Sequence, residues 1–310
     1  MNYLYHLYME ILSKYGLPKL FGDITFFILP FCIVALLMLI VVLALVLAER
    51  KLLGWLTQRK GPNRVGWWGL LQTLADAIKL LIKENITPDK SNRFLFNLAP
   101  ILVFIPAMTI LCIIPYCAEF TFVSTSTNVI LYLLLAAFPI LSIFLAGWAS
   151  NNKYSLLGAM RGIAQVLSYE VPMTFVVLSV IVLASSINLD GITLAQYSKY
   201  GFLGWYCLPC VLGFIIMFIC ILAELNRCPF DLPEAESELI CGYNTEYSGM
   251  RFALFYLSEY ILLFSNALFL SIMFLGGYLS PFGVYLSQLF LGESTLQTFL
   301  YILNKYFGWF

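Results

Sequence analysis

Long apolar stretches separated by short polar segments dominate this sequence. A transmembrane helix needs about 20 predominantly apolar residues, and in lipid a helix of that length satisfies its own backbone hydrogen bonds. We expect such helices at Ile24–Ala48, Phe94–Ala118, Thr127–Ser150, Tyr200–Ala223, Phe252–Leu275 and Thr295–Phe310. The last of these stretches is short and contains Lys305. The pattern favours an all-α, polytopic membrane protein.

A further apolar stretch, Tyr154–Ser186, contains charged residues and has Pro172 near its middle. It fits either two short helices or one long one. The positive-inside rule favours the single helix. Glu49–Arg93 holds nine of the seventeen basic residues and should lie inside, so the chain is inside again at Asn151–Lys153 after two more crossings. A single tilted or kinked helix of about 50 Å then puts residues 188–200 outside and residues 225–250 back inside. We therefore expect about seven transmembrane helices, with the fourth long and tilted and its charged first half buried among other helices.

Composition excludes several classes of protein. Hydrophobic residues make up 61% of the 310 residues and charged residues 11%, whereas soluble domains have about 45–50% and about 25%. A soluble globular protein, a disordered chain, a disulfide scaffold and a nucleic-acid binder are all excluded. Seventeen basic and seventeen acidic residues balance, so net charge recruits no partner. We expect a single membrane domain over residues 1–310, with its chemistry in the inside loops 49–93 and 224–251.

The first inside loop combines helix-breaking residues with an amphipathic stretch. Gly54, Gly61 and Pro62 predict a tight turn. A helix should follow at about Gly69–Glu84, because leucine and isoleucine recur on one face and polar residues on the other, as in a helix lying in the membrane interface. Its charges fit either anchors at the lipid surface or, for Asp76 with Lys79, an i,i+3 pair that faces a cavity.

The second inside loop concentrates acids among apolar residues. Six acids and Arg227 lie between two expected spans, interleaved with residues such as Phe230 and Leu239. A solvated loop is one interpretation. The other is a folded-in loop whose carboxylates share a poorly hydrated cleft, where some pKa values rise and the cluster stores and releases protons.

Within the expected spans, Arg161, Glu170 and Glu259 are costly to insert, at roughly 2.5–3.5 kcal/mol each at the bilayer centre. They favour a polar path inside the bundle, although Glu259 could also reach the membrane surface. Cys207 and Cys210 have the CxxC spacing, but with no second pair and only His6 in the whole chain we expect no metal site.

Three segments closely resemble a known family. They read AERKLLGWLTQRKGPNRVG followed by GLLQTLADAIKLLIKE, GAMRGIAQVLSYEVP, and LAELNRCPFDLPEAESELICGYNTEYSGMRFALFYLSEY. The family is the quinone-site membrane subunit of the proton-pumping NADH:ubiquinone oxidoreductase, respiratory complex I. The resemblance covers roughly residues 26–280 in order.

The resemblance implies a subunit that is not catalytic alone, with ubiquinone as the substrate of the complex. NADH, FMN and iron–sulfur clusters would belong to partner subunits. Those partners would be hydrophilic subunits carrying the terminal iron–sulfur cluster and small membrane subunits. The residues at quinone-binding positions would be Arg50, Arg59, Asp76, Lys79, Arg227 and Phe230. The residues at proton-coupling positions would be Glu224, Asp231, Glu234, Glu236, Glu238, Arg161, Tyr169, Glu170 and Glu259.

Several alternatives stay open at this point. The family continues into a basic loop and one more span, so a second short polypeptide could supply the end of a split subunit. A related hydrogenase- or ferredoxin-linked complex shares both loops. A stand-alone proton or ion transporter would use the buried charges, but we find none of the internal repeats common in transporters. We expect the mitochondrial inner membrane, with a bacterial plasma membrane as the alternative.

Overall fold

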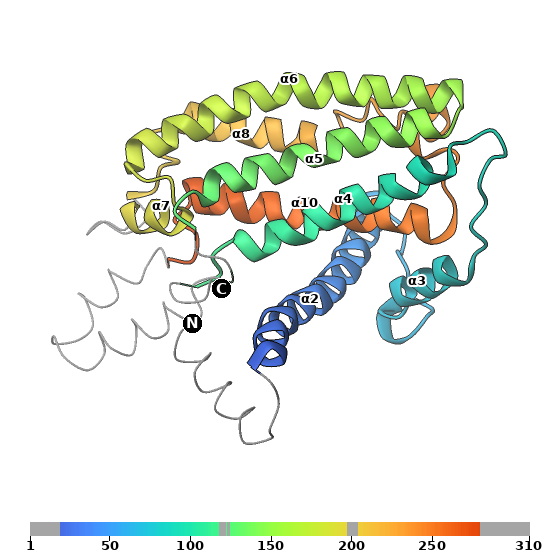
Figure 1. The fold of residues 1–310 in the computed structure, drawn as a ribbon, viewed down its shortest axis with the longest axis horizontal. Helices are drawn as coiled ribbons and strands as arrows, with labels where there is room; N and C mark the ends of the chain where they lie inside the picture. The colour runs from blue at the N-terminus through green and yellow to red at the C-terminus, as the bar shows by residue number, and fades with distance from the viewer. Residues whose placement is uncertain (1–18, 118–121, 123–124, 197–203, 280–310) are drawn as a thin grey trace.

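The structure is a computed structural model, and it describes residues 19–117, 122, 125–196 and 204–279. This part of the chain contains helices and turns but no strand (Figure 1). The longer helices are α2 (Lys19–Leu56), α3 (Gln72–Ile82), α4 (Arg93–Ile113), α5 (Asn128–Ala149), α6 (Lys153–Ala184), α8 (Val211–Glu224) and α10 (Gly249–Phe274). The shorter ones are η1 (Trp67–Gly69), α7 (Leu189–Ala195), α9 (Glu236–Leu239) and η3 (Gly242–Asn244).

The expected membrane architecture is confirmed for the described residues. Five helices, α2, α4, α5, α6 and α10, are long and apolar enough to cross a bilayer. Helices α4, α5, α6, α8 and α10 run alongside one another, whereas α2 crosses at a slant and meets α3 at its carboxyl end (Figure 1). The predicted span Thr295–Phe310 lies outside the described residues.

Small residues allow the central helices to approach one another closely. Gly147 of α5 lies against α6 so tightly that a Cβ atom there would come within 2.3 Å of the Ala159 Cβ. Small side chains at helix contacts are typical of membrane proteins, where van der Waals packing replaces the hydrophobic effect. Two stacked aromatic pairs, Tyr132 with Phe269 and Phe96 with Tyr247, fill the interior of the bundle.

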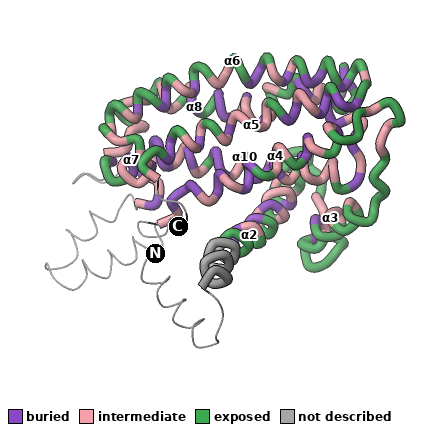
Figure 2. The backbone as a smooth tube through the Cα atoms, in the orientation of Figure 1, coloured by how far each residue is buried: buried purple, intermediate pink, exposed green. Residues whose placement is uncertain are grey.

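Helix α6 is continuous through Pro172, as the topology requires. The expectation that its charged first half is buried is wrong for Arg161, whose side chain is 39% exposed. The reason is that Gly158 and Gly162 form the packing face, where Gly242 and Pro233 of the acidic loop approach closely. Arg161 lies beside that face, and the outer side of α6 is largely exposed in this chain (Figure 2).

Helix α2 extends beyond the predicted end at Ala48 as far as Leu56. Glu49, Arg50 and Lys51 are good helix formers and outweigh the single glycine that follows. Gly54 therefore does not end the helix. It allows close approach of the returning loop, because a Cβ atom at Gly54 would lie 2.8 Å from the backbone nitrogen of Gly61.

Helix α8 is shorter than the predicted span Tyr200–Ala223, since it begins at Val211 and has 14 residues. At 1.5 Å per residue it covers about 21 Å, less than the hydrocarbon core of about 30 Å. The preceding turn packs on the end of α10, where the Cys207 backbone N–H donates to the Phe274 carbonyl. The buried Gln196 side chain donates to the Ile272 carbonyl and accepts from the Gly276 N–H. Buried protein contacts thus replace helix at this end.

The two inside loops are joined to each other. The Ile86 backbone N–H donates to the Ser248 Oγ at 3.0 Å, and the Asn85 Oδ1 accepts from the Met250 N–H at 3.2 Å. Gly249 has a φ of 59°, and a Cβ atom there would lie 2.6 Å from the Asn85 Oδ1. We call residues 84–86 with 248–250 the loop clasp. It fixes the start of α10 relative to the end of α3.

Candidate functional site

A wide groove lies between α2 and α3 at the carboxyl end of α2. Its lining is almost entirely apolar, and the centre of a water molecule can reach about 560 Å³ within it. The lining residues are Ile40, Leu43, Ala44, Leu47, Ala48, Lys51, Leu52, Trp55, Leu70, Leu71, Thr73 and Leu74. This α2–α3 groove is suited to an extended apolar molecule.

One ion pair bridges the two helices that form the groove. The Arg50 Nη1 donates to the Asp76 Oδ2 at 2.6 Å, and the Gln72 amide also donates to Asp76. The i,i+3 pairing of Asp76 with Lys79 that the sequence allowed is therefore replaced by a longer-range one. Lys79 and Arg59 are both exposed and do not line the groove. The Arg59 Nε donates to the Thr57 hydroxyl in the turn after α2.

Arg227 forms ion pairs with acids from two different helices, α2 and α10. Its Nη1 lies 2.9 Å from the Glu49 Oε1, and its Nε lies 3.0 Å from the Glu259 Oε1. The Tyr260 hydroxyl donates to the other Glu49 oxygen at 2.7 Å, and the guanidinium lies 4.9 Å from the Tyr260 ring centroid. Burial alone would lower the pKa of Arg227, but Glu259 and Glu49 together with Tyr260 raise it.

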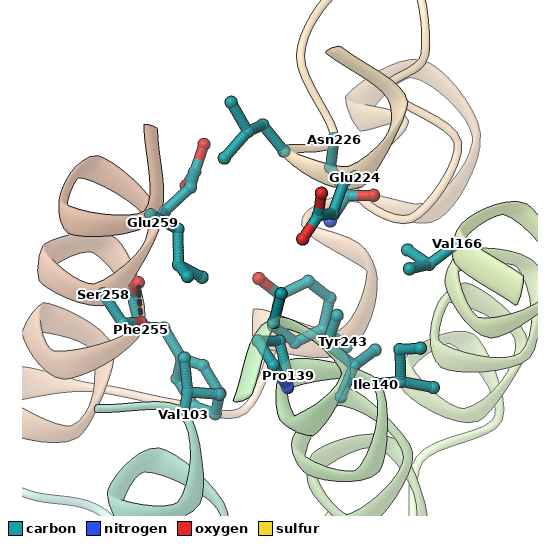
Figure 3. A pocket seen from close by; sticks show the side chains of 14 residues that line it. Val103, Pro139, Ile140, Val166, Glu224, Asn226, Tyr243, Phe255, Ser258 and Glu259 are labelled. Atoms are coloured by element: carbon teal, nitrogen blue, oxygen red, sulfur yellow. Dashed lines mark hydrogen bonds between the residues drawn. The ribbon is translucent and has the colours of Figure 1, made fainter. Parts of the chain in front are cut away.

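Glu259 and Glu224 line a common pocket among α4, α5, α6, α10 and the acidic loop. Figure 3 shows Glu224 with Asn226 across an empty space from Ser258 and Glu259. The centre of a water molecule can reach about 40 Å³ of this space, and its other walls are mainly apolar side chains such as Val166. We call it the Glu259 pocket. The Oε2 atom of Glu224 is buried and makes no hydrogen bond to any described residue.

A second pocket lies on the other side of Glu224. The centre of a water molecule can reach about 20 Å³ of it, and Tyr169 and Glu170 of α6 line it, so we call it the Glu170 pocket. The remaining lining residues are Leu133, Ala136, Ala137, Val166, Met173, Cys220 and Glu224. Glu224 thus lies between Glu259 on one side and Tyr169 with Glu170 on the other.

The start of the acidic loop is tied to α6. The buried Gln165 amide donates to the Ala223 carbonyl at 2.8 Å and to the Phe230 carbonyl at 2.7 Å. The Phe230 ring packs edge-on against Tyr169, with centroids 5.2 Å apart. Phe230 therefore lies beside the Glu170 pocket and not in the α2–α3 groove, where we expected quinone binding.

The other acids of the loop are not gathered in one cleft. The Arg161 Nη1 lies 2.5 Å from Glu238, whose side chain is 61% exposed, and Asp231 is exposed as well. Glu234 accepts from the Asn244 amide. Glu236 begins α9, and its side chain lies outside what the structure describes. The predicted poorly hydrated cleft is therefore wrong for Asp231 and Glu238 in this chain.

Tyr243 of the same loop is affected by two acids. Burial and nearby Glu234 and Glu259 raise the pKa of Tyr243.

Two functional candidates were missed from the sequence, Glu49 and Tyr260. Each faces Arg227 from a helix far away in the chain, and no local pattern marks them. Their position beside Arg50 and Glu259 was the only available signal. In the described residues, no group of three potential metal ligands occurs.

Comparison with known proteins gives consistent matches. The model of the family described as NADH dehydrogenase matches residues 29–310. The chain is 47% identical over 253 residues to the H subunit of the NADH-quinone oxidoreductase of Brevibacillus brevis, covering 80% of this chain and 74% of that protein. It is also 47% identical over 234 residues to the H subunits of the same enzyme in Bacillus cytotoxicus and Bacillus thuringiensis, covering 75% of this chain and 69% of each relative.

Proposed function

Since the chain belongs to the NADH dehydrogenase family, we propose that it is the quinone-site, energy-coupling membrane subunit of a proton-pumping NADH–quinone oxidoreductase. It acts in catalysis only as a part of that complex. The observation that carries the proposal is the position of Arg227, which joins Glu49, beside the α2–α3 groove, to Glu259 of the acid-lined pocket.

The α2–α3 groove would hold the quinone. An isoprenoid tail requires a long apolar surface, and this groove offers little else. The Arg50–Asp76 pair joins the two helices that form the groove and provides charged groups near it for a polar ring. Electrons for the quinone would come from an iron–sulfur cluster in a hydrophilic partner subunit, as the resemblance to the family implies.

The coupling would run through competition for Arg227. Reduction of a quinone adds negative charge until two protons arrive. Negative charge near Glu49 draws Arg227 away from Glu259, and a carboxylate that loses its cation in a poorly hydrated pocket gains a proton. Proton uptake at Glu259 is then linked to chemistry in the groove. Glu224, Glu170 and Tyr169 continue the polar region towards the middle of the bundle.

The exposed surfaces define where partners would bind. Arg59, Lys79, Asp231 and Glu238 are exposed at the inside end, and we assign them to contact with hydrophilic subunits. The outer face of α6 would contact small membrane subunits or lipid.

The chain belongs in an energy-transducing membrane as a multi-pass protein. The mitochondrial inner membrane was the expectation, and the bacterial relatives fit a plasma membrane equally. Their names also favour an NADH-linked complex over a hydrogenase-linked one. Membrane fractionation of the source cells distinguishes the two locations.

The decisive experiment is a native gel of mildly solubilised membranes, stained for NADH oxidation and followed by mass spectrometry of the active band. We expect peptides of this chain in that band, together with the hydrophilic subunits and any second fragment. A band that oxidises NADH and lacks this chain would refute the proposal.

A further inference from the structure

The two acid-lined pockets share three residues, and these form the boundary between them. Glu224, Ala136 and Val166 line both the Glu259 pocket and the Glu170 pocket. Glu259 lines only the first, and Glu170 lines only the second. Two separate spaces with different acids thus meet at one carboxyl group and two apolar side chains.

The two apolar members of the boundary are buried. Ala136 of α5 is 6% exposed and Val166 of α6 is also 6% exposed. Their methyl groups offer no hydrogen bond, and an internal water needs two to four polar partners to be held. The boundary between Ala136 and Val166 therefore opposes a continuous file of water from one pocket to the other.

The third member, Glu224, is placed to act in both pockets. It is the last residue of α8, and the chain leaves the helix immediately through Asn226, which has a φ of 50°. Its Oε2 is buried and makes no hydrogen bond within the usual distance and angle limits, and the Asn266 side chain interacts with the carboxyl group. Asn266 of α10 lies next to the carboxyl group, and its own oxygen accepts a hydrogen bond from Tyr132.

We propose that Ala136 and Val166 form an apolar partition between two proton-holding pockets, so that protons cross between the pockets on the Glu224 carboxyl and not along water. This inference rests on the proposed function and adds to it two positioning residues that are neither charged nor polar. In each transfer an O–H bond breaks on the donor acid, Glu259 or Glu170, and one forms on the Glu224 carboxylate. The reverse step returns Glu224 to its carboxylate form.

The apolar partition would limit proton back-flow, which a water-filled channel would not. A continuous water file would let protons run back as soon as the charge in the groove is neutralised. A carboxyl group that serves one pocket at a time passes a single proton per movement. The size of the partition should therefore control how many protons are moved for each electron.

The test uses the assembled complex in inverted membrane vesicles, with NADH as donor and a short-chain quinone as acceptor. Val166→Ala opens the partition, and Ala136→Val fills it. Quinone reduction is followed by NADH absorbance and proton movement by quenching of a pH-sensitive dye. Both are also measured in D₂O. The matched controls are Val171→Ala and Ala164→Val, which make the same changes on the exposed face of α6.

For Val166→Ala we expect the number of protons moved per electron to fall to half or less, because water joins the pockets. For Ala136→Val we expect turnover and proton movement to fall together by about 5-fold, with a larger solvent isotope effect since proton transfer becomes rate-limiting. The double variant should recover most of both losses, because it restores the volume of the partition. A change in packing alone would not raise the isotope effect.

Two outcomes would overturn the partition. One is that Val166→Ala and Ala136→Val give the same proton-to-electron ratio and isotope effect as their controls. The other is that the double variant stays as impaired as the worse single variant. Should Ala136→Val fail to assemble, the ratio measured for Val166→Ala decides. Wild-type vesicles without NADH-driven quinone reduction would instead refute the proposed function itself.

Discussion

The α2–α3 groove and the pair of acid-lined pockets lie on opposite sides of Arg227 and have contrasting physical properties. The groove is wide, open and almost wholly apolar, and one ion pair joins the two helices that form it. The pockets are smaller, lie deep among α4, α5, α6, α8 and α10, and each contains carboxyl groups. A molecule with a long tail can bind in the first, whereas only protons and water fit the second. Binding and proton movement are therefore separated in space, and Arg227 joins them.

The largest effect is expected when the junction between the two regions is removed. Arg227→Ala leaves Glu49 and Glu259 without their cation, and losing one partner of a buried pair costs about 3–5 kcal/mol. Because Arg227 is 26% exposed, the lower end applies. We expect less assembled complex and at least 10-fold lower quinone reduction in what assembles. Arg227→Lys, which keeps the charge and loses the forked geometry, should retain part of both. Normal turnover in assembled Arg227→Ala would contradict the role of the junction.

A second change affects the pockets alone. Glu224→Gln keeps the shape of the side chain but cannot carry a proton between the pockets. We expect turnover to fall by about 10-fold while the KM for quinone stays within 2-fold of wild type. Steady-state kinetics over a range of quinone concentrations separates the two parameters. A raised KM with normal maximal turnover would place Glu224 with the groove instead.

The converse change affects the groove alone. Asp76→Asn removes the charge that pairs with Arg50 while preserving size. We expect the KM for a long-chain quinone to rise by about 5-fold, with an unchanged number of protons moved per electron. Proton movement and quinone reduction measured in the same vesicles test this. A lower proton-to-electron ratio would show that the groove also controls proton movement, contrary to the proposed separation of the two regions.

The smallest effect is expected at the surface. Glu238 pairs with Arg161 at 2.5 Å, but both side chains are substantially exposed, and exposed ion pairs contribute about 0–1 kcal/mol. Glu238→Gln should therefore change turnover by less than 2-fold and leave assembly intact. Thermal inactivation and turnover of the variant check this. A loss as large as that of Glu224→Gln would show that a partner subunit buries Glu238.

The elements that the sequence predicts well are those with a local cause. The alternation of leucines and polar residues in α3 is visible in a single segment, whereas the length of α6 also needed the charge distribution of the first inside loop. Local pattern also identifies the apolar side of the groove. Arg50 and Asp76 were both candidates because the family resemblance matched them, and their pairing across 26 residues was not foreseen.

The parts that could not be predicted depend on packing between distant helices. Glu49 reaches Arg227 across 178 positions, and Tyr260 reaches Glu49 across 211. The exposure of Arg161 follows from the glycine face of α6 meeting the acidic loop. Likewise, Ala136 is an ordinary alanine in the sequence, and only the arrangement of α5 against α6 and α8 places it between two pockets.

The loop clasp has a consequence for biosynthesis. Ile86 and Ser248 are 162 positions apart, and at 5–20 residues per second a ribosome needs about 8–32 s to cover that distance. During this time α3 and its exposed neighbours Trp67 and Trp68 have no partner from the later chain. The position of α3 relative to the bundle is therefore fixed only after α10 begins to form. A cell that makes this protein needs the membrane-insertion machinery to shield the early loop until its late partner arrives.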